Sequence, residues 1–91
     1  VRVVPFLALL LSGAALAVTP EQIAAALALR EAGRPAEAQA ALEQLAVAEP
    51  RNPEVNYQLG VLAYLRDDTE AAIRHLETAL AVAPGEARYH Y

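Results

Sequence analysis

Residues 53–86, PEVNYQLGVLAYLRDDTEAAIRHLETALAVAPGE, carry the strongest structural signals in this sequence. Asp67-Asp68 interrupts this largely apolar segment near its middle, and Pro84-Gly85 ends it. Asn52 can cap a helix that begins at Pro53. Proline is favourable at the first helical position, because the N–H that it lacks would have no partner there. The Asp67-Asp68 pair is placed to cap a second helix in the same way. The stretch therefore predicts two helices folded back on each other as a hairpin.

The preceding segment begins with the same signals. Thr19 can cap a helix that begins at Pro20, and Gln22 is placed to complete a capping box. The apolar run that follows stops at Gly33, and Pro35 starts another helix. This segment predicts a second hairpin, so the sequence predicts four helices joined by short breaks.

The two predicted hairpins correspond position by position at one fixed spacing. Three of the four identical pairs at this spacing fall at a small residue, a large apolar residue and the closing proline of the second helix. The corresponding positions are Gly33 and Asp67 at the turns, Ala38 and Ala72, Leu42 and Leu76, Glu43 and Glu77, and Pro50 and Pro84. The spacing predicts an internal repeat.

Residues 53–86 resemble a tetratricopeptide repeat, whose 34-residue pattern has the same spacing and reads W-x2-L-G-x2-Y, then A-x3-F, then P. Asn56 replaces the tryptophan of the pattern, and Ala63 replaces its tyrosine. Residues 19–52 match less closely, with Ala26 in place of the glycine and Leu29 in place of the tyrosine. The residues that match the pattern in the second unit are Leu59, Gly60, Ala72, Leu76 and Pro84.

The resemblance implies an all-α solenoid of antiparallel helix hairpins. It implies one repeat at 19–52, a second at 53–86, and the start of a third at 87–91, where Tyr91 occupies the position of Tyr57 and Ile23. Gly60 and Ala72 are small where the helices of a hairpin would approach closely. The side chains expected to fill the space around that contact are Leu59, Leu62, Ile73, Leu76 and Leu80.

The first residues, VRVVPFLALLLSGAALAV, differ from the rest of the chain. One arginine, a short apolar run and the small residues Ala15-Leu16-Ala17 are the features of a secretory signal peptide. We predict a signal peptide at residues 1–17, cleaved after Ala17 to expose Val18, and hence export to the periplasm or the medium. An uncleaved membrane anchor is the alternative. A lipid anchor is excluded, because Ala14 stands where the acylated cysteine would be required.

The composition argues against several classes of function. A net charge of −4 opposes nucleic-acid binding, which depends on basic clusters. Cysteine and lysine are absent and the one serine lies in the leader, so the common nucleophiles are missing. A metal site at His75 and His90 would need carboxylates that converge on both, and we do not expect one. We therefore predict no enzyme activity, no cofactor, no metal and no small-molecule substrate.

In tetratricopeptide repeat proteins the first helix of each repeat lines a concave face, and the resemblance carries this role to seven positions. A partner peptide or helix would contact Ile23, Leu27, Arg30, Tyr57, Val61, Tyr64 and Tyr91. Alternatively, Tyr57 and Tyr64 pack between neighbouring repeats. Leu27 and Val61 stand where carboxylate-binding members of the family carry asparagine, so recognition of a terminal carboxylate is not expected.

These observations predict an exported scaffold that binds a protein or peptide partner. The alternative is the front of a longer envelope-assembly protein or enzyme whose chemistry lies beyond Tyr91. Arrays of this kind generally need about three units, because one repeat cannot bury its apolar face alone. We therefore also predict marginal stability and self-association through uncovered repeat ends.

Overall fold

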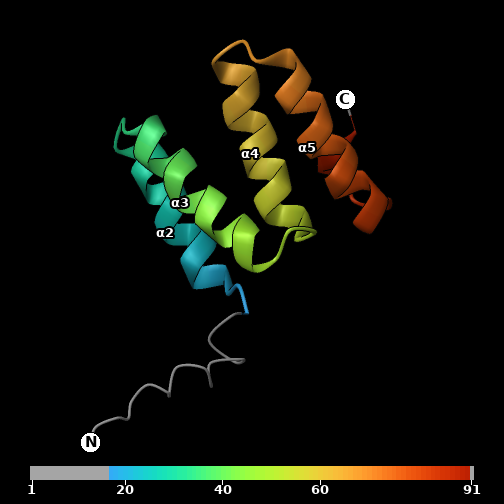
Figure 1. Cartoon of the computed structure of the whole chain (residues 1–91), viewed down its shortest axis with the longest axis horizontal. Coiled ribbons are helices and arrows are strands. Elements are labelled where there is room, and N and C mark those ends of the chain that lie inside the picture. Colours follow the sequence, from blue (N-terminus) through green and yellow to red (C-terminus); the bar gives the residue numbers. More distant parts are fainter. Residues whose placement is uncertain (1–16, 91) are drawn as a thin grey trace, which may run out of the picture.

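The computed structural model describes residues 17–90, and in this part of the chain the fold is all-α. Figure 1 shows the helices stacked side by side, with α4 between α3 and α5. The predicted fold of antiparallel helix hairpins is confirmed. Ala15, Tyr91 and the body of the predicted leader lie outside the described residues. The elements are α2 (Pro20–Glu31), α3 (Pro35–Ala48), α4 (Pro53–Leu65), α5 (Thr69–Val82) and a short 3-10 helix, η2 (Ala87–Tyr89).

Side-chain caps fix three of the four helix starts, as the sequence predicts. The Thr19 hydroxyl accepts a hydrogen bond from the Gln22 N–H at 3.2 Å, and the Gln22 side chain accepts one from the Thr19 N–H at 2.9 Å. Asn52 accepts from the Val55 N–H at 2.9 Å, and Asp68 accepts from the N–H of Ala71 at 3.2 Å. Each cap satisfies a backbone donor that the first helical turn would leave unpaired.

The two hairpin turns use the same backbone conformation at corresponding positions. Gly33 has φ 82° and Asp67, its counterpart in the second hairpin, has φ 66°. Glycine adopts this left-handed conformation without a steric penalty, and aspartate is one of the few other residues that adopt it regularly. The repeat spacing is therefore expressed in the backbone itself, even though the two residues differ.

The main core joins both hairpins. Its buried members come from α2, α3 and α4, so the second hairpin packs on the first and not only on itself. The cluster consists of Ile23, Ala26, Ala38, Leu42, Val55, Leu59 and Leu62. A smaller cluster of Ala63, Ala71 and Ala72 lies between α4 and α5. Alanines dominate this second contact, so the two helices pack closely.

Gly60 lies where α4 and α5 approach each other closely. A Cβ atom at this position would lie 3.0 Å from the Leu76 Cγ and 3.3 Å from the Ala72 carbonyl oxygen. The predicted close contact of Gly60 with Ala72 is therefore confirmed. The expectation that Ile73 fills the space around it is wrong, since Ile73 is 50% exposed. One residue advances a helix by about 100°, which turns Ile73 away from the contact that Ala72 makes.

Candidate partner-binding surface

The predicted contact residues of the first hairpin are largely covered. Ile23 is only 9% exposed and belongs to the main core, and Leu27 is partly buried against that core. Both line a hollow of about 460 Å³ that Val18, Pro53 and other residues at the starts of α2 and α4 complete. Ile23 and Leu27 therefore form the floor of a hollow and do not project from the surface.

The predicted contact residues of α4 differ from one another in exposure. Tyr64 is 72% exposed, whereas Tyr57 and Val61 are half-buried. Val61 and Tyr64 line a hollow of about 300 Å³ together with Gly60 and Leu76. Each tyrosine therefore follows a different alternative. Tyr57 packs against another part of the chain, and Tyr64 is open to solvent.

Arg30 lines a third hollow, of about 530 Å³, beside the turn that joins α2 and α3. Its floor includes Leu62 and Leu65, and Leu65 is 65% exposed. Arg66 stands in the same lining, where its guanidinium donates to Gln39 at 2.9 Å. Five of the six described contact residues therefore line three separate hollows, and Tyr57 lines none of these three.

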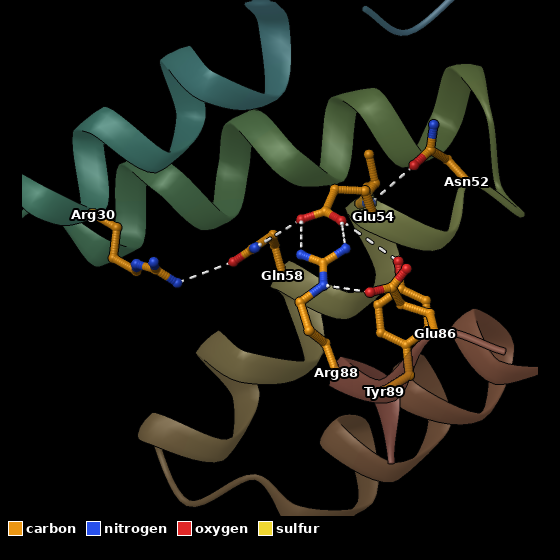
Figure 2. A network of polar contacts seen from close by, with 8 residues as sticks. Arg30, Asn52, Glu54, Gln58, Glu86, Arg88 and Tyr89 are labelled. Atoms are coloured by element: carbon orange, nitrogen blue, oxygen red, sulfur yellow. Dashed lines mark hydrogen bonds and ion pairs between the residues drawn. The ribbon is translucent and has the colours of Figure 1, made fainter. Parts of the chain in front are cut away.

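A run of polar contacts, drawn in Figure 2, links the first helices of successive units. Arg30 donates from α2 to the Gln58 side-chain oxygen at 3.0 Å, and Gln58 donates to Glu54 at 3.0 Å. Glu54 then accepts two hydrogen bonds from the Arg88 guanidinium, at 2.7 and 3.3 Å. Gln58 is 6% exposed, and these two contacts give both the oxygen and the nitrogen of its buried amide a hydrogen-bond partner. We call this run of four residues the Arg30–Arg88 network.

The charges of the network stabilise each other. Partial burial alone would raise the pKa of Glu54, but hydrogen bonds from Arg88 and Gln58 outweigh it and lower that pKa. Hydrogen bonds to Glu54 and Glu86 raise the pKa of the Arg88 guanidinium. Burial is the main cause that raises the pKa of the Tyr89 hydroxyl, and the Glu54 carboxylate adds to it. The ionised forms of Glu54 and Arg88 are therefore the ones that the fold favours.

Tyr57 packs beside the Arg30–Arg88 network and is not freely exposed to a partner. Its ring centre lies 5.1 Å from that of Tyr89, and the guanidinium carbon of Arg88 lies 5.2 Å from the Tyr57 ring centre and 5.4 Å from that of Tyr89. A guanidinium at this distance from an aromatic face is attracted by its quadrupole. The segment after α5 therefore covers Tyr57, which leaves Tyr64 as the aromatic residue of α4 that is open to solvent.

Sequence reasoning missed Glu54, Gln58 and Arg88 as members of this surface. The signal that could have found two of them is the repeat spacing, because Glu54 and Arg88 occupy corresponding positions of successive units and carry opposite charges. No comparable signal marks Gln58, whose role depends on the three-dimensional position of Arg30.

His75 connects the two helices of the second hairpin. Asn56 is 4% exposed, and its amide donates to the carbonyl oxygens of Pro50 and Asn52, both at 2.9 Å. Its side-chain oxygen must then accept the 2.9 Å contact from the His75 Nδ1, which fixes the tautomer that carries a proton on Nδ1. Burial is the largest cause that lowers the pKa of His75, and the charges of Arg74 and Arg66 add to it.

The described part of the chain shows neither a cluster of metal ligands nor a membrane-spanning helix. Between residues 17 and 90 no three histidine, cysteine, aspartate or glutamate side chains lie together as metal ligands. Over the same residues no helix is long and apolar enough to cross a membrane. His75, as described above, is instead held by an amide.

Comparison with known proteins decides the family. The model of the tetratricopeptide repeat family matches residues 29–91, which is more than half of the chain. The chain belongs to the tetratricopeptide repeat family. No curated protein and no solved structure matches it at a significant level.

Membership of the tetratricopeptide repeat family indicates a scaffold for protein–protein interaction, and repeats of this family are generally non-catalytic. The match begins inside α2, at residue 29, so residues 19–28 of the first predicted repeat lie outside it. This limit agrees with the weaker resemblance of that unit to the repeat pattern.

Proposed function

We propose that this tetratricopeptide repeat chain binds an extended peptide or a helix of a protein partner over the surface that α2 and α4 present. The observation that carries the proposal is the exposure of Tyr64, a 72% exposed aromatic side chain at the rim of an apolar hollow. Tyrosine contributes large contact area at low cost in conformational entropy, and it is enriched among residues that dominate binding energy.

The chemistry of the hollows supports a partner with apolar side chains. Tyr64, Val61 and Leu76 offer an apolar recess on one side of α4, and Leu62 with Leu65 offers a second one at its end. Arg30 and Arg66 border the second recess. A partner segment that places apolar residues in these recesses, with an acidic residue near the two guanidinium groups, would complement both shape and charge.

A peptide selection tests the proposal even though the natural partner is not identified. Random peptides are selected against the full chain, and the affinity of the selected peptides is measured by fluorescence anisotropy. We expect Tyr64→Ala to weaken binding by about tenfold or more, which corresponds to about 1.4 kcal/mol. Because Tyr64 is mostly exposed, the unfolding transition of this variant should stay unchanged.

The matched controls are Glu43→Ala and Glu77→Ala, which remove exposed side chains from the second helices of the two hairpins. Binding should be retained in both. Peptides that bind Tyr64→Ala as tightly as the parent chain, or that lose binding only in the glutamate variants, would contradict the proposed surface.

We further propose that the chain is exported and that its leader is removed after Ala17. The support is the order of charge, apolar run and small residues in the leader, together with the exposure of Ala17 next to the predicted cleavage point. N-terminal sequencing of the protein recovered from the periplasm or medium of an exporting bacterial host is the test. Export predicts Val18 as the first residue, and an intact chain held in the membrane would instead support the uncleaved anchor.

A further inference from the structure

The backbone of Val18 lies against a carboxylate that is already held in place. The Val18 N–H donates to the Glu49 Oε2 at 3.0 Å, across 31 residues of sequence. The other oxygen of the same carboxylate, Oε1, accepts from the Asn52 amide at 2.8 Å. Asn52 in turn caps α4 through the N–H of Val55. Glu49 is therefore oriented by the turn that joins the two hairpins, and it faces the residue that opens the first one.

The side chain of Val18 is also positioned by the fold. It is partly buried and packs on the main core, in the hollow that Ile23 and Leu27 line. Ala17, one residue earlier, is exposed. Among the described residues, contact with the core thus begins at Val18, directly after the peptide bond where the leader pattern places cleavage.

We propose that the Ala17–Val18 bond is a processing site whose product is bound by the fold itself: the new α-ammonium group of Val18 forms an ion pair with Glu49 and fastens the N-terminus to the turn between the hairpins. This inference rests on the proposed removal of the leader and adds a structural role to it. The hydrolysis needs only water and a peptidase. The C–N bond between Ala17 and Val18 breaks, water supplies the oxygen of the new Ala17 carboxylate, and the Val18 nitrogen takes up protons to become an ammonium group.

The change in charge makes the processed contact stronger than the one present before cleavage. A backbone N–H is a single neutral donor, whereas an ammonium group carries a full charge and three donors. The present N–H bond to the Glu49 carboxylate is already assisted by one charge, and the ammonium group adds a direct attraction between opposite charges and two further donors. The hydrogen bonds from Asn52 and from the Val18 N–H already lower the pKa of Glu49, so the carboxylate is ionised and ready to pair at neutral pH.

The other charged groups around Val18 do not replace Glu49. Glu54 lines the same hollow, but it is bound to Arg88 at 2.7 Å. Glu21, in the first turn of α2, and Arg51, in the turn after Glu49, are both exposed. Solvent screens charges at such positions. Glu49 is therefore the group that should control the titration of the new N-terminus.

The composition gives this proposal an unusually clean test. All seven basic residues are arginine, so the α-amino group of Val18 would be the only amine in a processed chain of residues 18–91. Reductive methylation with ¹³C-formaldehyde labels that amine alone, and its pKa follows from the chemical shift of the label as a function of pH. An α-amino group in an unfolded chain has a pKa of about 7.7–8.0. We expect the folded, processed chain to show a value at least about half a unit above that of its Glu49→Gln variant.

Two controls separate the ion pair from other effects. Glu43→Gln makes the same change of charge on an exposed part of α3 and should leave the raised pKa in place. A glycine inserted between Ala17 and Val18 moves the amine about 3.8 Å along the chain, and this should return the pKa to that of Glu49→Gln. An ordinary pKa in the parent chain, or equal values in the parent and Glu49→Gln chains, would overturn the inference.

The pH dependence of stability provides a second test, in which the direction of the change can be predicted. A raised pKa in the folded state stabilises the processed chain below about pH 8, and this contribution is lost as the pH rises through the folded-state value. The urea midpoint of the processed chain should therefore decrease between about pH 8 and 10 relative to Glu49→Gln. The full chain, in which the Val18 nitrogen is an amide, should show no such decrease.

Failure of export and failure of the ion pair are distinguishable. N-terminal sequencing of exported protein tests the cleavage. For the pKa measurement, the processed chain can be released from the full chain by a protease sequence inserted directly before Val18, which leaves the same first residue. Cleavage at another bond would overturn the proposed processing site even if the released chain showed the raised pKa.

Discussion

Two leucines at corresponding positions should respond very differently to truncation. Leu42 on α3 and Leu76 on α5 occupy the same place in successive hairpins. Leu42 is fully buried beneath the second hairpin, with 0% exposure. Leu76 is half-buried and lines the hollow of about 300 Å³ beside Tyr64. The difference between them therefore measures what a covering hairpin contributes.

The magnitudes follow from burial. Leu42→Ala removes three buried carbon atoms, worth about 2–2.5 kcal/mol in transfer free energy, and leaves a closed cavity that brings the expected loss to about 3 kcal/mol. Leu76→Ala loses roughly half of the transfer free energy and leaves no closed cavity, because the hollow is already open. We expect it to lower the free energy of unfolding by about 1 kcal/mol.

Urea unfolding of the full chain, followed by circular dichroism in the far ultraviolet, measures both losses. Glu43→Gln and Glu77→Gln, each one residue further along and exposed, are the matched controls and should change the midpoint little. If Leu76→Ala cost as much as Leu42→Ala at low protein concentration, α5 would be covered in the monomer. If the two costs converged only as concentration rises, a second copy would cover α5, as the predicted self-association requires.

Four further tests, three with single variants and one with a double variant, address particular contacts and one turn. Gly60→Val should destabilise the chain by about 1–3 kcal/mol in urea unfolding, because its side chain must enter the contact between α4 and α5. Gly33→Ala should cost about 1–2 kcal/mol in the same assay, because φ 82° is strained for alanine. His75 has a pKa lowered below its ordinary value, so stability should fall as the pH decreases through about 6.5, and His75→Gln should flatten the urea midpoint in that window. Exchanging the charges in the double variant Glu54→Arg, Arg88→Glu should restore the ring-current shift of Tyr89 that either single substitution removes.

Each of these tests has a definite counter-result. Gly85→Ala is the control for the two glycine substitutions, since nothing lies within 4 Å of its Cβ position and its φ is not positive. Equal costs at Gly60 and Gly85 would contradict the close helix contact, and equal costs at Gly33 and Gly85 would contradict backbone strain at the Gly33 turn. A stability profile that is unchanged by His75→Gln would assign the slope to another group. Tyr89 shifts that survive both single charge changes would show that ring packing alone holds the segment.

The helix boundaries could be predicted because each one is encoded locally. Thr19, Asn52 and Asp68 cap the helices that follow them, as local hydrogen-bonding rules require. Gly33 and Asp67 are different residues at corresponding positions of the two repeats, yet both adopt the left-handed backbone conformation. The repeat spacing therefore predicts their shared geometry, which a comparison of residue types would miss. These features depend on residues only a few positions apart, which is why sequence alone reveals them.

The surface was harder to predict because it depends on contacts between hairpins. The stripe of Tyr57, Val61 and Tyr64 follows from helical periodicity, but periodicity does not distinguish a tyrosine covered by Arg88 from one that is 72% exposed. The same limit explains Ile23, which the stripe places in a groove and the structure places in the core. Exposure at a repeat position is set by the neighbouring unit, and the neighbour differs at each end of the array.

The Arg30–Arg88 network shows what the repeat spacing does for this chain beyond packing. Apolar contacts between alanine-rich helices are non-directional, so on their own they fix the sliding of one hairpin over the next only weakly. Arg30 binds Gln58 of the next hairpin, and Glu54 binds Arg88 of the segment after it. Because each of these bonds joins successive units at one distance and angle, a shift of either unit along its neighbour would leave a buried amide or a charge without its partner. The network therefore favours one register of each unit on the next, which apolar packing alone would favour less strongly.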